Sequence, residues 1–201
     1  MLCYNGSGEN MKKNILIFGT PRSGKSTLAN MIFEKLKYQI IRSDSERHAL
    51  KEVFPDLNIN AKTASKSKEF QLYLKSLLKQ SEHINKDRFG IVLEGANTSV
   101  IDCNELFNNG NNLIYYLGTI DSTPEKLALA IKENDTDKDW TYEYSFEKLL
   151  EIAKEHIEHS KRNKELCEKY GFRFVDTSKN RNQVLEQIVK EIEQEMNNEK
   201  E

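Results

Sequence analysis

The sequence predicts an α/β fold in which a parallel sheet of five strands lies between two layers of helices. The first observation is that short apolar runs alternate with longer stretches of helical periodicity; these runs are residues 15–18, 38–41, 91–93, 113–117 and 172–175. Such alternation is typical of parallel sheets covered by helices on both faces. The second observation is the length of 201 residues, which suits one well-buried domain rather than two.

A glycine-rich loop follows the first expected strand. Residues 19–27 read Gly-Thr-Pro-Arg-Ser-Gly-Lys-Ser-Thr, a complete G-x-x-x-x-G-K-S/T pattern between an apolar strand and a helical run. Glycine lets the backbone approach phosphate groups closely, and the positive end of the following helix attracts them. The pattern therefore predicts a site for a nucleoside triphosphate, with these binding residues: Gly19, Pro21, Arg22, Ser23, Gly24, Lys25, Ser26 and Thr27.

Two side chains of this loop have expected chemical roles. Lys25 is expected to reach the β- and γ-phosphates as a positive charge, which makes it a candidate catalytic residue. The hydroxyl of Ser26 is expected to ligate Mg²⁺. The loop thus predicts a nucleotide together with a magnesium ion.

Carboxylates stand near the ends of three other expected strands, at Asp44, Glu94 and Asp176. In open α/β sheets, ligands bind beyond the carboxyl ends of the strands. We expect Glu94 to hold Mg²⁺ or its water shell, or to contact the phosphoryl acceptor, as a second metal-binding and catalytic residue. The alternative for Glu94 is a charge that points to solvent. The alternative for Asp44 is an ordinary helix cap, shared with Ser43.

The expected helices form two insertions and a closing segment. The first insertion, residues 45–88, is named the arm and has helical patterns around 45–54 and 64–84. The second, about residues 120–160, is named the lid; its helix at about 123–134 and its polar loop at 135–140 precede a helix at about 145–170. A last helix is expected at about 181–196. The domain is expected to span residues 11–196, between a disordered extension at 1–10 and a fraying tail at 197–201.

Together these residues resemble the P-loop kinases related to adenylate, shikimate and gluconate kinases, chloramphenicol phosphotransferase, zeta toxins and polynucleotide kinase. The segment Arg-Ser-Asp-Ser-Glu-Arg, residues 42–47, is similar to the D-x-x-R that follows the second strand in that family. The resemblance implies a three-layer P-loop fold with ATP as the phosphoryl donor, an acceptor-binding arm and a mobile lid. It further implies that Asp44 deprotonates an acceptor hydroxyl, that Arg47 holds an anionic part of the acceptor, and that Asp176 and Thr177 lie beside the adenine.

The sequence departs from this family in two places. Nucleoside monophosphate kinases carry an arginine shortly after the position of Glu94, whereas this chain has Ala96, Asn97 and Thr98. Family lids supply arginines, but no arginine occurs between Ile91 and Lys161. The remaining candidate cations near the lid are Arg22, Lys132, Lys138, Lys161 and Arg162. His156 and His159, one helical turn apart, are interpreted as part of an exposed polar face rather than as a metal pair.

The expected function is transfer of the γ-phosphoryl group of ATP to a small cytosolic acceptor, at a hydroxyl. One alternative is a nucleoside monophosphate kinase, and another is a nucleotide-binding protein or ATPase with little transferase activity. A GTP-binding switch is disfavoured because residues 85–88, Asn-Lys-Asp-Arg, have the wrong spacing for guanine recognition and precede a strand. The residues do not identify the acceptor.

Composition and the first residues argue against several other classes, although a local basic patch remains open. The formal net charge of −2 gives no basic field for nucleic acid, including polynucleotide ends, or for an anionic membrane. No apolar run is long enough to span a bilayer, and the first residues do not have the pattern of a secretory signal, so a cytoplasmic location is expected. Three cysteines without C-x-x-C spacing predict reduced thiols rather than disulfides or a zinc site.

Overall fold

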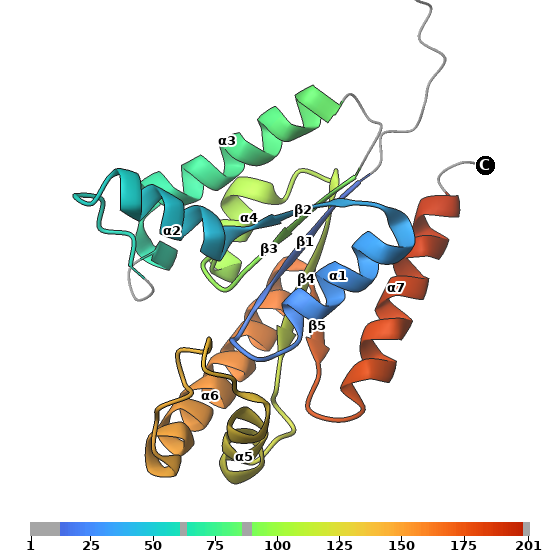
Figure 1. Ribbon diagram of the computed structural model, residues 1–201. Coiled ribbons are helices and arrows are strands. Elements are labelled where there is room, and N and C mark those ends of the chain that lie inside the picture. The colour runs from blue at the N-terminus through green and yellow to red at the C-terminus, as the bar shows by residue number, and fades with distance from the viewer. Residues whose placement is uncertain (1–12, 61–63, 86–89, 199–201) are drawn as a thin grey trace, which may run out of the picture.

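Five parallel strands form one sheet at the centre of the molecule, as Figure 1 shows. The computed structural model describes residues 13–60, 64–85 and 90–198. The strand order is β2-β3-β1-β4-β5, and every pairing is parallel. The strands are β1 (Asn14–Gly19), β2 (Gln39–Arg42), β3 (Ile91–Glu94), β4 (Asn112–Gly118) and β5 (Arg173–Asp176). The predicted α/β class and five-stranded parallel sheet are confirmed.

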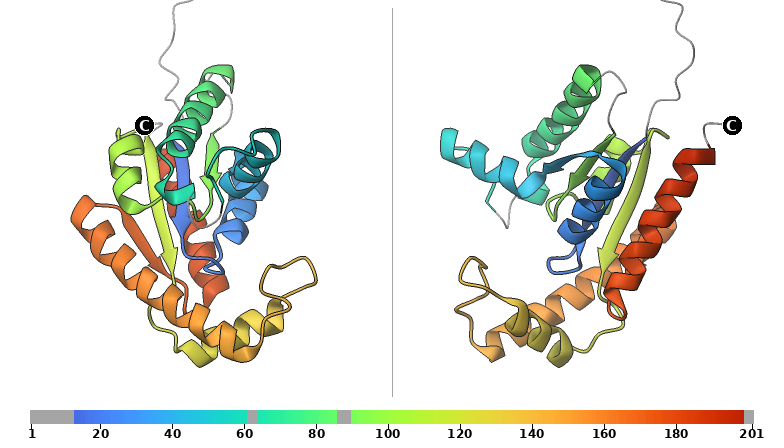
Figure 2. Two further views of the ribbon diagram at one scale, coloured as in Figure 1. Left: turned by 90° about the vertical axis from the view of Figure 1, so that its left-hand side faces the viewer. Right: turned by 45° about the vertical axis from the view of Figure 1, so that its right-hand side comes forward.

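Helices connect the strands and cover both faces of the sheet (Figures 1 and 2). They are α1 (Lys25–Leu36), α2 (Ser43–Val53), α3 (Lys68–Asn85), α4 (Val100–Phe107), α5 (Pro124–Asn134), α6 (Phe146–Tyr170) and α7 (Arg181–Asn198), with a short 3₁₀ helix at Ala64–Lys66. The arm contains α2, the 3₁₀ helix and α3. The lid contains α5, the connecting loop of residues 135–145, named the lid loop, and the first part of α6.

The alternation of side chains along β1 builds the two core layers. Leu16 and Phe18 point to one face, where α3, α4 and α6 pack, and Ile15 and Ile17 point to the other, where α1 and α7 pack. All four side chains are fully buried. A central parallel strand has two buried faces, which explains why residues 15–18 form a continuous apolar run instead of an alternating one.

A separate apolar cluster joins α5 to α6. It contains Leu127, Ile131, Leu149, Ala153 and Ile157, all buried. Because these residues pack on one another and not on the sheet, the lid has a small core of its own. The long helix α6 then carries the lid toward the sheet, where its later turns pack on β4 and β5.

Helix α4 was not predicted from the sequence. It begins after Ser99, whose side chain accepts a hydrogen bond from the backbone N–H of Asp102 at 3.1 Å. The signal that was missed is this serine cap followed by Val-Ile-Asp, a common start of a helix. Helix α2 also begins two residues before the predicted 45–54, so that Asp44 lies in its first turn.

Some expectations fall outside the part of the chain that the structure describes. The proposed extension at residues 1–10 lies there, as do residues 199–201 of the proposed tail, whereas α7 continues through residues 197 and 198. No helix in the described ranges is both long enough and apolar enough to cross a membrane. Cys103 and Cys167 are buried free thiols.

The contact between α4 and the sheet should carry a large share of the stability. Phe107 is 2 % exposed, and its ring centroid lies 6.3 Å from that of Phe18. We expect Phe107→Ala to lower the free energy of unfolding by about 3–5 kcal/mol, because it removes buried apolar contacts and leaves a cavity. Urea unfolding measures this change. The control Leu129→Ala removes a half-exposed side chain and should change the value by less than about 0.5 kcal/mol; equal losses in both variants would contradict the packing described.

Candidate active site

The glycine-rich loop runs from the end of β1 to the start of α1 and is held by backbone geometry. Gly19 has φ of 129°, and a Cβ there would lie 2.0 Å from the carbonyl oxygen of Leu117, so only glycine fits. Gly24 has φ of 95° and precedes the first residue of α1. The loop therefore turns the free N–H groups of the first turn of α1 toward one point, the arrangement that binds phosphate.

A residue that follows β5 also holds the glycine-rich loop in place. The hydroxyl of Thr177 donates to the carbonyl oxygen of Ser23 at 2.9 Å, with the Gly118 carbonyl oxygen at 3.1 Å. The hydroxyl of Ser23 in turn donates to the carbonyl oxygen of Thr20 at 2.8 Å. Thr177, predicted as a nucleotide-binding residue, is 1 % exposed, so its side chain braces the loop in this structure.

Asp176 likewise ties two loops together. Its Oδ1 accepts hydrogen bonds from the backbone N–H groups of Ile120 and Ser178, both at 3.1 Å. The loops that follow β4 and β5 are thereby joined next to the glycine-rich loop. Any contact of Asp176 with a base remains a prediction.

Lys25 is a buried charge at the centre of the site. It is 7 % exposed, and its Nζ donates to the carbonyl oxygen of Thr20 at 2.6 Å. Burial lowers the pKa of Lys25 to about 8, although the negative charges of Glu94 and Asp44 oppose this shift. Because this ammonium group has lost most of its contact with water, a bound polyanion would stabilise its charge.

Glu94, at the end of β3, contacts the loop directly. The hydroxyl of Ser26 donates to Glu94 Oε1 at 3.1 Å, and Arg42 Nε lies 3.4 Å from the same oxygen. Burial raises the pKa of Glu94, while Lys25, Ser26 and Arg42 act in the opposite direction. The alternative of a solvent-directed charge is wrong, because Glu94 is 5 % exposed.

The hydroxyl of Ser26 and the carboxylate of Glu94 form an oxygen pair of the kind that Mg²⁺ prefers. The donor types therefore fit the predicted ion. In the described residues, no group of three or more His, Cys, Asp or Glu side chains forms a metal site of the protein alone. Two protein oxygens suit an ion whose other ligands are water and phosphate oxygens.

Asp44 lies beside these groups at the start of α2. The helix N-cap is Arg42, without a side-chain cap, so the interpretation of Asp44 or Ser43 as the cap is wrong. Asp44 Oδ1 instead accepts a hydrogen bond from Asn97 Nδ2 at 2.7 Å, and Arg47 Nε lies 3.7 Å away. The carboxylate is 55 % exposed, so it is held in place by the protein and still reachable by a ligand.

Asn97 is a site residue that the sequence did not single out for a role. Its Nδ2 donates a hydrogen bond that positions Asp44, and its backbone carbonyl oxygen accepts a hydrogen bond from Gln71 Nε2 at 2.6 Å. Gln71 Oε1 accepts from the hydroxyl of Thr98 at 3.0 Å. The signal that could have identified Asn97 is the run of polar residues, Asn-Thr-Ser, that begins three positions after the end of a buried strand.

Arg47 lies mostly inside the arm. It is 8 % exposed, and its Nη2 lies 2.9 Å from Nε2 of His48. Its Nε makes no hydrogen bond to any described residue, although the carboxylate of Asp44 is near. The arrangement leaves a buried donor next to the exposed carboxylate.

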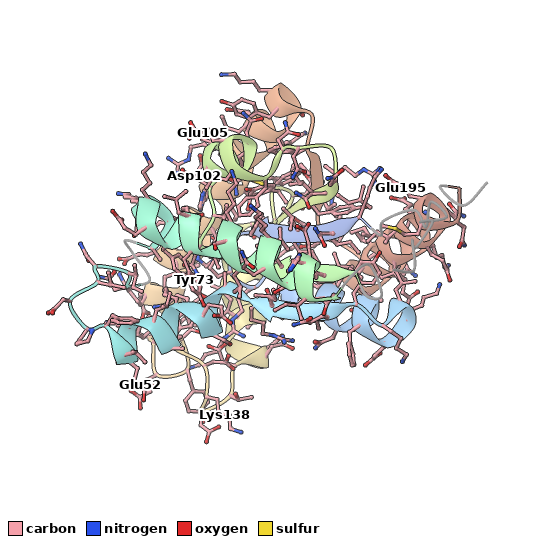
Figure 3. The ribbon with its side chains drawn as sticks, turned by 90° about the horizontal axis from the view of Figure 1, so that it is seen from above. Glu52, Tyr73, Asp102, Glu105, Lys138 and Glu195 are labelled. Carbon is pink, nitrogen blue, oxygen red and sulfur yellow. The ribbon has the colours of Figure 1, made fainter. Side chains whose placement is uncertain are left out.

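A cavity of about 460 Å³ lies further along the arm, between α2 and α3. Its walls are mainly apolar and include Leu50, Phe54, Phe70 and Tyr73. Figure 3 shows Tyr73 on α3, and its hydroxyl donates to Glu46 on α2 at 2.6 Å. This contact joins the two arm helices between the cavity and the turn that carries Asp44.

Arg22 was predicted to bind nucleotide, but in this structure its guanidinium is bound to the lid loop. It pairs with Asp135 and, at 3.1 Å, with Asp139 Oδ1; its Nη2 also donates to the hydroxyl of Thr141 at 3.1 Å. Asp135 is almost fully buried, with 1 % of its side chain exposed. Arg22 thus links the glycine-rich loop to the lid.

Within the described residues, no ion pair connects the other candidate cations near the lid to the glycine-rich loop. Lys161 pairs with Glu158 on the same helix at 2.7 Å, and Lys132, Lys138 and Arg162 are exposed. Figure 3 shows Lys138 at the edge of the molecule, on the same side as Glu52 of α2. Of the two histidines interpreted as an exposed polar face, His159 is exposed, whereas His156 is partly buried and its Nδ1 is inaccessible to solvent.

Comparison with solved structures identifies the architecture. The chain is similar to a gluconokinase from Sinorhizobium meliloti 1021, with a TM-score of 0.58 and 14 % identity over 94 % of this chain and 95 % of that one. It is also similar to shikimate kinase from Bacteroides thetaiotaomicron, with a TM-score of 0.57 and 15 % identity over 92 % and 98 %. The fold is that of the P-loop kinases.

A deoxyadenosine kinase from M. mycoides also matches, with a TM-score of 0.49 and 20 % identity over 90 % of this chain and 99 % of that one. No family model matches the chain, and no curated protein matches it. The P-loop kinase resemblance expected from the sequence is confirmed at the level of fold by the gluconokinase and the shikimate kinase. The roles of the individual site residues remain predictions.

The burial of Lys25 should make stability depend on pH. Its pKa in the folded protein, about 8, lies below the unfolded value of 10.5, so between these values the unfolded chain binds more protons. The free energy of unfolding should therefore rise as pH increases from 8. Between pH 7.5 and 9.5 we expect this rise to be about 2 kcal/mol larger in the wild type than in Lys25→Met, as measured by urea unfolding. Parallel pH profiles for the two proteins would contradict the burial of a charged Lys25.

The Arg22 contacts should hold the lid loop in place. Arg22→Gln removes the charge that faces Asp135 and Asp139, so backbone N–H groups at residues 135–144 should exchange with deuterium faster than in the wild type, by about tenfold. Hydrogen-exchange mass spectrometry measures this. The control Arg162→Gln changes an exposed arginine of α6 and should leave the exchange as it is; identical rates in all three proteins would show that Arg22 does not restrain the lid.

Proposed function

We propose that the protein is a cytoplasmic, ATP-dependent kinase that transfers the γ-phosphoryl group to a hydroxyl of a small acceptor. The observation that carries this proposal is the meeting of Lys25, Glu94 and Asp44 at the carboxyl edge of the sheet, next to the glycine-rich loop. The P-loop kinase fold supports it. Phosphoryl transfer requires little covalent chemistry from the protein, so a site that positions two reactants and stabilises charge is sufficient.

The donor half of the proposed site is the glycine-rich loop. Its N–H groups and the Lys25 ammonium bind the phosphates, with the ammonium compensating the charge of the β- and γ-groups. Ser26 and Glu94 hold Mg²⁺, which when bound neutralises part of the phosphate charge. Glu94 and Ser26 are already in contact, so little rearrangement of the protein is needed to present these two oxygens.

The acceptor half is built around Asp44. Its carboxylate accepts the proton of the acceptor hydroxyl while the oxygen of that hydroxyl bonds to the γ-phosphorus and the bond from this phosphorus to the bridging oxygen of ADP breaks. Asn97 orients the carboxylate through the 2.7 Å hydrogen bond. The half-exposed position of Asp44 provides access, and the arm cavity, of about 460 Å³, has a size suited to a small molecule.

A second candidate acceptor is a nucleoside monophosphate. Arg47 favours it, because a buried guanidinium whose Nε makes no hydrogen bond could hold the acceptor phosphate. Asn97 favours the alcohol instead, since it stands in the region where nucleoside monophosphate kinases carry a further arginine. A protein that binds or hydrolyses ATP with little transfer is the third candidate.

An ADP-release assay with Mg-ATP distinguishes these candidates. The acceptor panel contains sugars, sugar acids, amino alcohols, antibiotic-like alcohols and nucleoside monophosphates, and Lys25→Ala is the blank. Release that depends on an alcohol supports the proposed function, and release that depends on a monophosphate supports the second candidate. Release that no acceptor stimulates, with ATP bound, would replace both with the third.

Asp44→Asn tests the base directly. We expect the turnover rate to fall by about 10²- to 10⁴-fold, because the amide cannot accept the hydroxyl proton, while the affinity for Mg-ATP changes little. Steady-state kinetics with the acceptor found above gives the rate, and calorimetry gives the affinity. The control Glu52→Gln neutralises an exposed carboxylate at the other end of α2 and should leave both values unchanged. Unchanged turnover in Asp44→Asn would remove Asp44 from the mechanism.

A further inference from the structure

Helix α6 is attached to the glycine-rich loop through Ser160. The hydroxyl groups of Ser160 and Thr20 lie 3.2 Å apart in a hydrogen bond, and the backbone N–H of Thr119 donates to Ser160 Oγ at 3.1 Å. The same hydroxyl donates to the carbonyl oxygen of His156 at 2.8 Å. Residues four apart share one face of a helix, so the side chain of His156 lies on the face that meets the loop, one turn nearer the lid.

His156 is partly buried, and its imidazole lacks a full set of partners. Its Nδ1 is inaccessible to solvent and has no hydrogen-bond partner among the residues that the structure describes. Burial, with a smaller contribution from the positive charges of Lys25, His159 and Arg22, lowers the pKa of His156 to about 4. Of these charges, Lys25 and Arg22 belong to the glycine-rich loop. Both charges act on the ring from the loop, and with this pKa the imidazole is neutral at pH 7 in the protein without ligand.

The positively charged residues that act on His156 have different partners. Arg22 is paired with Asp135 and Asp139 of the lid loop, whereas Lys25 is held by the carbonyl oxygen of Thr20. His159, on the same helix, is exposed and lies near Arg162. A buried polar nitrogen without a partner costs free energy, and an oxygen of a ligand bound at the loop would offset this cost.

We propose that His156 donates a hydrogen bond from Nδ1 to a phosphate oxygen of the nucleotide bound at the glycine-rich loop. It thereby makes the contact to phosphate for which the lid of this chain offers no arginine. The inference rests on the nucleotide site of the proposed function and is independent of the acceptor and of Asp44. A polyphosphate next to the ring also compensates the charges of Lys25 and Arg22, so nucleotide binding favours the protonated imidazole, which is a stronger donor.

Calorimetric titration with the non-hydrolysable analogue Mg-AMPPNP tests the contact without any need for transfer. We expect His156→Ala to weaken binding by about tenfold or more, since a hydrogen bond to a charged group is lost. His156→Asn, whose amide N–H₂ can occupy nearly the place of Nδ1, should recover part of the affinity. The matched control His159→Ala removes an exposed histidine one turn further along α6 and should bind as the wild type does.

NMR titration of the wild-type imidazoles provides a readout that does not depend on how well a variant folds. The pKa of His156 should rise when Mg-AMPPNP saturates the protein, whereas that of His83, exposed near the end of α3, should not change. An unchanged pKa of His156 in the complex, or wild-type affinity in His156→Ala, would overturn the inference and leave the proposed function intact. A wild-type protein that binds no Mg-AMPPNP would overturn both.

Discussion

The arrangement of the site depends on the burial of the Lys25 ammonium. An amine this far from water is stable only because the carbonyl oxygen of Thr20 accepts its hydrogen bond and the carboxylates of Glu94 and Asp44 are near. These partners come from three different strand ends, so the charge can be satisfied only when β1, β2 and β3 are in register. A fold that compensates one buried cation in this way also assembles the groups that a triphosphate and its acceptor need.

Helix α6 connects this centre to the lid. At one end it packs with α5 in the apolar cluster of the lid, and in its middle Ser160 bonds to Thr20 and to the backbone of Thr119. Arg22 makes the second connection, from the glycine-rich loop to Asp135 and Asp139. Ser160 and Arg22 thus join α6 and the lid loop to the glycine-rich loop. His156 lies on α6 one turn from Ser160, on the side of the lid.

The sequence predicted the features that local patterns determine. The strands followed from apolar runs, and the glycine-rich loop followed from residue spacing, because both depend on nearby residues alone. Helix α4 was missed although its signal, the cap at Ser99, is local. Other failures depended on contacts distant in sequence. Asn97 acquires its role from Asp44, 53 positions earlier, and Arg22 is turned toward the lid by Asp135, 113 positions later. His156 was assigned to an exposed face because its helical neighbours are charged, whereas Ser160, one turn along the same helix, bonds to Thr20, 140 positions earlier.

The measurement that tests the central claim most directly is calorimetric titration of Mg-ATP into the wild-type protein and into Lys25→Ala. If the buried ammonium and the loop around it form a site for a triphosphate, the wild type binds Mg-ATP and Lys25→Ala loses at least about 100-fold in affinity, because a buried charge-assisted contact is removed. The same affinity in both proteins, or no binding to the wild type, would contradict the claim that this arrangement exists to hold phosphate.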